Sequence, residues 1–134
     1  MKYLGVDFGL RKIGTAVGDD ISYMAVPFAL VPGGADAAVR LGLLARQEGI
    51  EAVVVGLPIP TDVTQSTKQL ELTQAFVEEL KGVTELPVFV IDEQFSSAEA
   101  RRVRVEYGAT ATEDEIAAML ILQAYFDEQT RRVL

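Results

Sequence analysis

The chain has 134 residues, of which 49% are hydrophobic and 24% charged, so it can form one folded domain, residues 1–134, with its own core. It has no cysteine and no histidine, which excludes disulfides, thiolate zinc sites and Ser-His or Cys-His catalytic pairs. Its net charge of −8 opposes nucleic-acid binding by the surface as a whole, so phosphate contacts would need local clusters of basic residues.

Targeting signals are absent from the pattern of the chain. Met1 leads directly into an apolar segment without a charged leader, and the longest apolar run, residues 116–122, is far too short to span a bilayer. We therefore expect a soluble cytoplasmic protein that has no membrane partner.

The first quarter of the chain predicts three strands joined by tight turns. Residues 2–7 are short, apolar and β-rich, and residues 12–18 alternate larger side chains with glycine and alanine. Residues 21–30 form a third strand that we expect to be interrupted near Pro27. Consecutive strands joined by short turns pair antiparallel, so this region predicts a three-stranded meander.

The rest of the chain alternates helices and strands. Helices are predicted at residues 35–48, 66–82, 96–107 and from 112 onward, and strands at residues 51–55 and 87–91. The last three helices begin with capping boxes, Ser66 with Gln69, Ser96 with Glu99 and Thr112 with Glu115. For the first helix we expect Val39, Leu43 and Leu44 to face the core. Alternation of this kind favours parallel strands with right-handed crossovers, so the prediction is an α/β fold with a mixed five-stranded sheet flanked by helices.

Acidic residues follow the strands that this topology places side by side. Asp7 ends the first strand, and Asp92 and Glu93 end the fifth. Ligands of open α/β sheets bind beyond the carboxyl ends of parallel strands, near the switch in strand order. Asp114, in the first turn of the last helix, can add another carboxylate there. Neighbours on a strand face opposite sides, so only one of Asp92 and Glu93 should reach the site.

Three clustered carboxylates, Asp7, Glu93 and Asp114, would raise one another's pKa values unless cations neutralise them. Oxygen ligands suit Mg²⁺ or Mn²⁺, and a pair of such ions can hydrolyse a phosphodiester without histidine or cysteine. Each acid taken alone also has a structural interpretation. Asp7 can close a turn, Glu93 can precede a helix cap, and Asp114 can sit in a first helical turn where any acid is favoured.

Four segments in order resemble the YqgF family of small bacterial nucleases. They are "LGVDFGLRKIGTAV", "VVVGLPIPTD", "VIDEQFSSAEA" and "DEIAAMLILQAYFD", and together they span nearly the whole chain. The resemblance implies an RNase H-like fold and a metal-dependent nuclease, in agreement with the pair of Mg²⁺ or Mn²⁺ ions inferred above. It also implies that the acids of the family motif fall on Asp7, Glu93 and Asp114.

The resemblance has departures near the site. Gln94 stands where the family usually has arginine, and Val63 stands where the loop after the fourth strand usually has glycine. The basic pair of the first hairpin appears as Arg11-Lys12, in the reverse of the usual order. We expect the nucleic-acid backbone to be held by the basic residues Arg11, Lys12, Arg101, Arg102 and Arg104.

Several functions stay open at this level. The favoured one is 5′-end processing of the precursor of 16S ribosomal RNA, and the alternative is resolution of Holliday junctions, for which a homodimer would supply two sites related by a two-fold axis. A non-catalytic interaction module of the same fold is a third, and the net charge of −8 is its best support. A nucleotide-binding ATPase is a fourth, but related ATPases close two such domains over ATP.

Overall fold

The computed structural model describes residues 1–60, 62–93 and 97–133. Its elements in chain order are β1 (Lys2–Asp7), β2 (Lys12–Asp19), β3 (Met24–Pro32), α1 (Ala37–Gln47), β4 (Ala52–Leu57), α2 (Lys68–Val83), β5 (Val88–Asp92), α3 (Ser97–Tyr107), the 3₁₀ turn η1 (Gly108–Thr110) and α4 (Glu113–Val133). The predicted order of strands and helices is confirmed, with η1 as the only addition among the described residues. No helix in the described ranges is long and apolar enough to cross a membrane.

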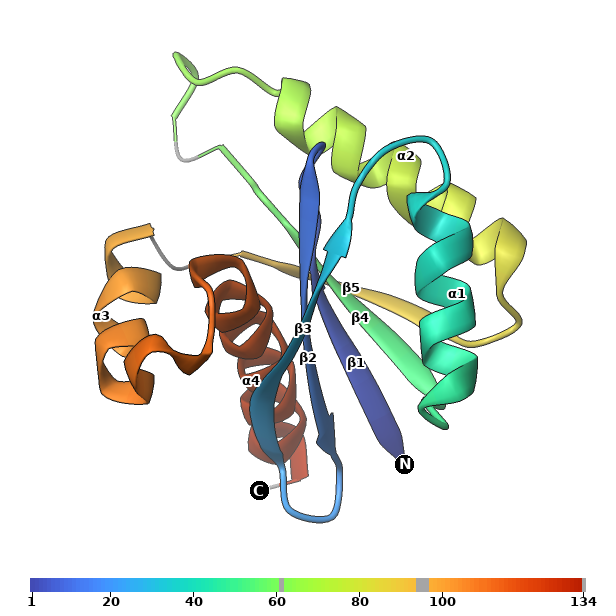
Figure 1. The fold of residues 1–134 in the computed structure, drawn as a ribbon. Coiled ribbons are helices and arrows are strands. Elements are labelled where there is room, and N and C mark those ends of the chain that lie inside the picture. The colour runs from blue at the N-terminus through green and yellow to red at the C-terminus, as the bar shows by residue number, and fades with distance from the viewer. Residues whose placement is uncertain (61, 94–96, 134) are drawn as a thin grey trace.

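The five strands form one mixed sheet in the order β3-β2-β1-β4-β5 (Figure 1). The three N-terminal strands pair antiparallel, whereas β4 runs parallel to β1 and β5 runs parallel to β4. The predicted fold class is therefore confirmed. Since β1 lies between β2, to which it is antiparallel, and β4, to which it is parallel, the switch in strand order falls at β1. The carboxyl end of this strand is Asp7.

Helices cover both faces of the sheet (Figure 1). On one face, α1 and α2 bury a cluster that includes Leu4 and Val6 of β1, and Phe8 stacks on Phe76 of α2 with ring centroids 4.5 Å apart. On the other face, α4 crosses β1, β2 and β4, and Phe126 meets the edge of the Tyr3 ring at 5.3 Å. Side chains alternate along a strand, so Tyr3 and Asp7 share the α4 face while Phe8 points to the α2 face.

Of the predicted core face of the first helix, Leu44 packs against the buried cluster as expected, but Val39 and Leu43 do not face the core. Val39 and Leu43 are 49% and 55% exposed, and the side chains that α1 buries are Ala37, Ala38, Leu41 and Ala45. These residues follow helical spacing, so they form one stripe down the helix. Most of the buried side chains are therefore alanines, whereas Val39 and Leu43 lie on the outer surface of the helix.

The third strand and the second helix begin later than predicted. The third strand begins at Met24 rather than residue 21, because the Asp19 carboxylate accepts hydrogen bonds from the N–H groups of Ile21 and Ser22 and holds them in a turn. The second helix begins at Lys68 after Thr67, and the Ser66 hydroxyl accepts from the Lys68 N–H at 3.1 Å rather than forming the predicted box with Gln69. The predicted Ser96 box involves a residue outside the described ranges.

The interruption expected near Pro27 takes the form of a register shift between β2 and β3. Thr15 is fully buried at this shift. Its hydroxyl donates to the Ala29 carbonyl at 2.7 Å and accepts from the Ala29 N–H at 3.0 Å. The side chain thus replaces backbone pairing that the irregular ladder loses.

Candidate active site

Asp7 is the centre of the candidate site. It ends the central strand and is partly buried. Its carboxylate forms no hydrogen bond or ion pair with any described residue. Burial raises the pKa of its carboxyl to about 8, and the negative charges of Glu93 and Asp114 push the pKa in the same direction. The charges of Glu93 and Asp114 therefore act on Asp7, as the predicted placement of the three acids near one rim of the sheet requires.

Gly14 explains how Asp114 comes to lie beside Asp7. Gly14 is the residue of β2 directly opposite Asp7 in the antiparallel register. The first turn of α4 packs onto the backbone at this point, so closely that a methyl group on Gly14 would overlap the carbonyl oxygen of Asp114. The missing side chain of one strand residue therefore sets the position of an acid from a distant helix.

A capping box fixes the first turn of α4. The Thr112 hydroxyl accepts from the Glu115 N–H at 3.2 Å and donates to the Glu115 carboxylate at 3.1 Å. This is the third predicted capping box, and it is confirmed. Since Asp114 lies between the two partners, the box holds the backbone that carries it.

The charge of Glu93 raises the pKa of Asp7, whereas Asp92 is not among the groups that affect this pKa. The Glu93 N–H donates to the Leu57 carbonyl at 2.8 Å, which ties the chain to β4 just after β5 ends. Ile91 packs into the cluster under α4, so by alternation Glu93 shares that face and Asp92 points away. Burial raises the pKa of Glu93 above its ordinary value. Of the two acids left open by the sequence, Glu93 is the one beside Asp7.

The acids approach one another without forming a closed metal cage. Within residues 1–60, 62–93 and 97–133, no group of three acidic side chains is close enough to hold one ion together. Mg²⁺, however, commonly takes only one or two protein carboxylates and fills its shell with water and substrate phosphate. A donor set made only of carboxylate oxygens fits such ions, and Lys12 offsets part of the charge on Asp114.

The five basic residues predicted to bind nucleic acid divide into two groups. Lys12, Arg101 and Arg104 contact the start of α4: Lys12 Nζ lies 3.5 Å from Asp114 Oδ2, Arg101 Nη1 lies 3.8 Å from Glu113 Oε1, and Arg104 Nε donates to the Ala111 carbonyl at 2.9 Å. The side chains of Arg11 and Arg102 are exposed and have no hydrogen bond or ion pair with a described residue.

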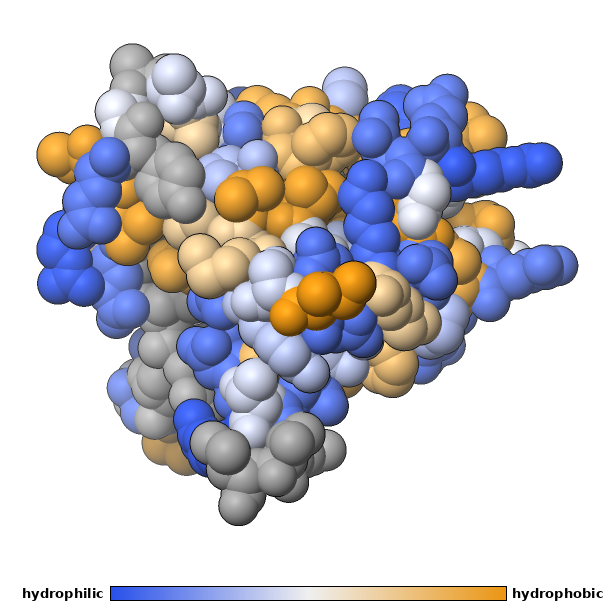
Figure 2. Space-filling model, turned by 90° about the horizontal axis from the view of Figure 1, so that it is seen from below, coloured by the Kyte–Doolittle hydropathy of each residue, from blue (hydrophilic) through white to orange (hydrophobic). Residues whose placement is uncertain are grey.

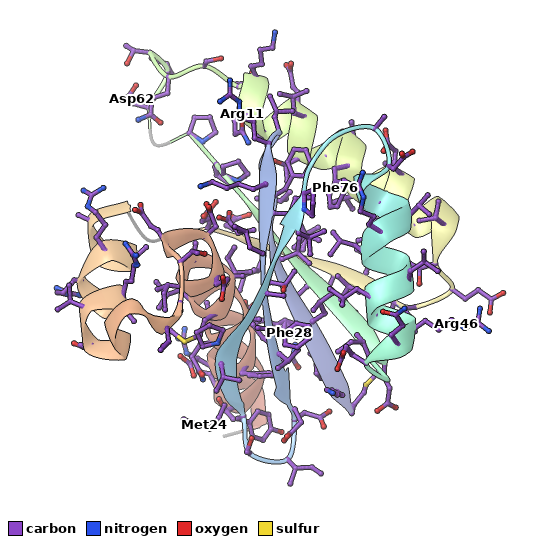
Figure 3. The ribbon with its side chains drawn as sticks, viewed as in Figure 1. Arg11, Met24, Phe28, Arg46, Asp62 and Phe76 are labelled. Atoms are coloured by element: carbon purple, nitrogen blue, oxygen red, sulfur yellow. The ribbon has the colours of Figure 1, made fainter. Side chains whose placement is uncertain are left out.

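Arg11 lies at the same end of the sheet as the acids, near the loop that carries Asp62 (Figure 3). The opposite end, with both termini, mixes hydrophilic and hydrophobic side chains without a single dominant kind (Figure 2). Arg11 and the acids thus lie at the same end of the molecule, where the phosphates of one substrate strand can contact both.

Sequence reasoning missed the contributions of Gly14 and Arg104. The signal for Gly14 was present, since Gly14, Ala16 and Gly18 place only small residues on one face of the second strand. Such a face predicts close approach of another element. No sequence signal separates Arg104 from its neighbours, because its partner is a backbone carbonyl.

Comparisons with known proteins show the family to which the chain belongs. Residues 1–128 match the RuvX family, described as Holliday junction resolvase. A relative from Nitratidesulfovibrio vulgaris, named "Putative pre-16S rRNA nuclease", is 37% identical over 134 residues, which is 95% of this chain and 94% of the relative. One of the same name from Anaeromyxobacter is 35% identical over 134 residues, covering 95% and 97%.

Solved structures show the same fold at low sequence identity. RuvC from T. thermophilus, in complex with a Holliday junction substrate, superposes with a TM-score of 0.61 at 15% identity, covering 97% of this chain and 96% of that one. The fowlpox virus resolvase in complex with junction DNA gives a TM-score of 0.59 at 12% identity, covering 96% and 99%. The fold is therefore that of the RNase H-like resolvases.

Proposed function

Because this chain belongs to the RuvX family, we propose that it is a metal-dependent nuclease that trims the precursor of 16S ribosomal RNA. Two relatives that are 35% and 37% identical over nearly the whole chain are named "Putative pre-16S rRNA nuclease". The observation that carries the proposal is a buried carboxyl beside two other acids: burial, and then the charges of Glu93 and Asp114, raise the pKa of Asp7 to about 8. Such a cluster of acids lowers the stability of the folded protein, so we infer that it serves a function.

Asp7, Glu93 and Asp114 would be the residues that hold Mg²⁺ or Mn²⁺. Bound ions of this kind supply an activated water and neutralise the charge of the phosphodiester. Asp7 would have to give up its proton when an ion binds, because a coordinating carboxylate must be ionised. Lys12 now neutralises part of the charge on Asp114 and would be displaced from it, or share it, in the loaded site.

Exposed basic side chains would hold the substrate through its phosphates. Arg11 and Arg102 have no protein partner among the described residues and so are available for this contact. Contacts of this kind position a strand without reading its sequence. On an acidic protein they should give binding that weakens steeply as salt increases.

Cleavage of four-way DNA junctions is the second candidate. It is favoured by the family description and by the fold shared with resolvases solved on junction DNA. Symmetric junction cutting needs two active sites related by a two-fold axis, so this function requires a homodimer. Trimming of RNA requires only one site.

One assay separates the candidates. Purified protein with Mn²⁺ or Mg²⁺ is offered a 16S precursor fragment, single-stranded DNA and a four-way junction, with Asp7→Asn as control. We expect metal-dependent cleavage of the RNA that the variant lacks. Cleavage of the junction alone would replace the RNA proposal with the resolvase. No cleavage of any substrate, with RNA binding retained, would favour the non-catalytic module.

A further inference from the structure

The arginine-rich helix α3 lies beside the start of α4, away from the sheet (Figure 1). Its main neighbours are α4 and η1, and Ala100 is buried in the cluster under α4. A helix that exists only to present basic side chains to a substrate would not need such packing. Its placement suggests that α3 also supports the segment that begins α4.

Arg104 makes a side-chain hydrogen bond from α3 to that segment. Its Nε donates to the carbonyl of Ala111 at 2.9 Å, and Ala111 is only 5% exposed. A charged donor to a buried carbonyl is among the stronger protein hydrogen bonds. The Arg101–Glu113 pair nearby is longer, at 3.8 Å, with both side chains largely in solvent, so it adds little.

The bonded carbonyl directly precedes the cap of α4. Fixing the Ala111 carbonyl fixes the peptide plane that leads into Thr112, whose hydroxyl caps the helix at Glu115. The backbone of Asp114 lies inside that capped turn, against Gly14. The hydrogen bond from Arg104 thus holds the residue that precedes the cap. The cap in turn holds the backbone of Asp114, the acid beside Asp7.

We propose that Arg104 is a positioning residue that places Asp114, and that Arg102 supplies the phosphate contact of α3. The inference rests on the proposed function, because it gives Asp114 a part in the site. Residues 101 and 104, three apart, lie on the same side of the helix, whereas residue 102 is turned about 100° away. Arg102 is exposed and has no hydrogen bond or ion pair with a described residue, as a phosphate ligand requires.

The test compares Arg104→Gln, Arg104→Lys and Arg102→Gln. For Arg104→Gln we expect kcat to fall about tenfold or more, as misplaced catalytic groups cause, with KM changed less than about twofold. Arg104→Lys should behave in the same way, because an ammonium at the chain end cannot replace a donor at the Nε position. Arg102→Gln should instead raise KM and reduce the salt slope of binding by about 1.

A second readout needs neither metal nor RNA. Hydrogen exchange of the amides of residues 113–116 should accelerate in both Arg104 variants and stay as in the wild type in Arg102→Gln. Unchanged exchange in the Arg104 variants would overturn the inference, as would wild-type kinetics in Arg104→Lys beside a raised KM in Arg104→Gln. If Arg104→Gln does not fold, Arg104→Lys carries the comparison. An inactive wild-type protein would refute the proposed function, and the exchange result would still decide the inference.

Discussion

Replacing Asp7 by asparagine is expected to abolish cleavage and to stabilise the metal-free protein. The loss of activity should be on the order of 10³-fold or more, because bound metal ions contribute several kcal/mol to stabilisation of the transition state. Asparagine keeps the shape of the side chain but removes the charge that Glu93 and Asp114 repel. A single-turnover cleavage assay and thermal unfolding in chelator measure the two effects.

The gain in stability should depend on pH. The pKa of Asp7 is raised to about 8 in the folded protein from 3.8 in the unfolded chain, so folding takes up a proton between these values. Stability of the wild type therefore falls as pH rises from about 4 to about 8, relative to Asp7→Asn. One pKa unit corresponds to about 1.4 kcal/mol, so the difference should reach a few kcal/mol above pH 8.

The expected pattern has a matched control in Asp92→Asn. Asp92 is the neighbouring acid at the end of β5, and it adds no charge at Asp7. Its replacement should leave both the cleavage rate and the pH dependence near those of the wild type. An Asp7→Asn protein that cleaves normally, or that is less stable than the wild type at pH 8, would contradict the assigned role of Asp7.

Gly14→Ala is expected to cause the largest effect away from the acids themselves. A methyl group at this position would overlap the carbonyl oxygen of Asp114, and both partners are backbone, so α4 must shift. Overpacking of this kind costs about 1–3 kcal/mol of stability. Displacement of Asp114 should also reduce cleavage about 10²-fold, because catalysis tolerates little misplacement of its groups.

Gly82→Ala is the matched control for this prediction. Gly82 lies near the end of α2, and an added methyl group there meets no atom within 4 Å. We expect this variant to gain up to about 1 kcal/mol from the higher helix propensity of alanine, with unchanged cleavage. Equal behaviour of the two variants in unfolding and cleavage assays would show that α4 is not seated on Gly14 as described.

The parts of the site that follow from strand ends could be predicted from the sequence. Asp7 and Glu93 lie at the carboxyl ends of strands whose order fixes them at one rim, and the Thr112 box announces the start of the helix that carries Asp114. The resemblance to the family and its fold is confirmed by the match over residues 1–128. The metal and nucleic-acid roles of individual residues stay predictions.

Contacts between distant elements could not be predicted. Helix α1 buries three alanines and Leu41 and leaves Val39 and Leu43 exposed, so the size of its apolar side chains does not show which face is buried. The contact between Arg104 and Ala111 depends on how α3 docks beside α4, which no local pattern encodes. Choice between Asp92 and Glu93 likewise needed the observed burial of Ile91.

Calorimetric titration with Mn²⁺ tests the central claim most directly. Measured in buffers of different ionisation enthalpy, it reports both binding and the protons released. The wild type should bind Mn²⁺ and release about one proton at pH 6.5 but almost none at pH 9.5, because the pKa of Asp7 is about 8 and coordination needs the ionised form. Asp7→Asn should not bind. Equal Mn²⁺ affinity in the two proteins, with no proton released at pH 6.5, would contradict a metal site built on Asp7.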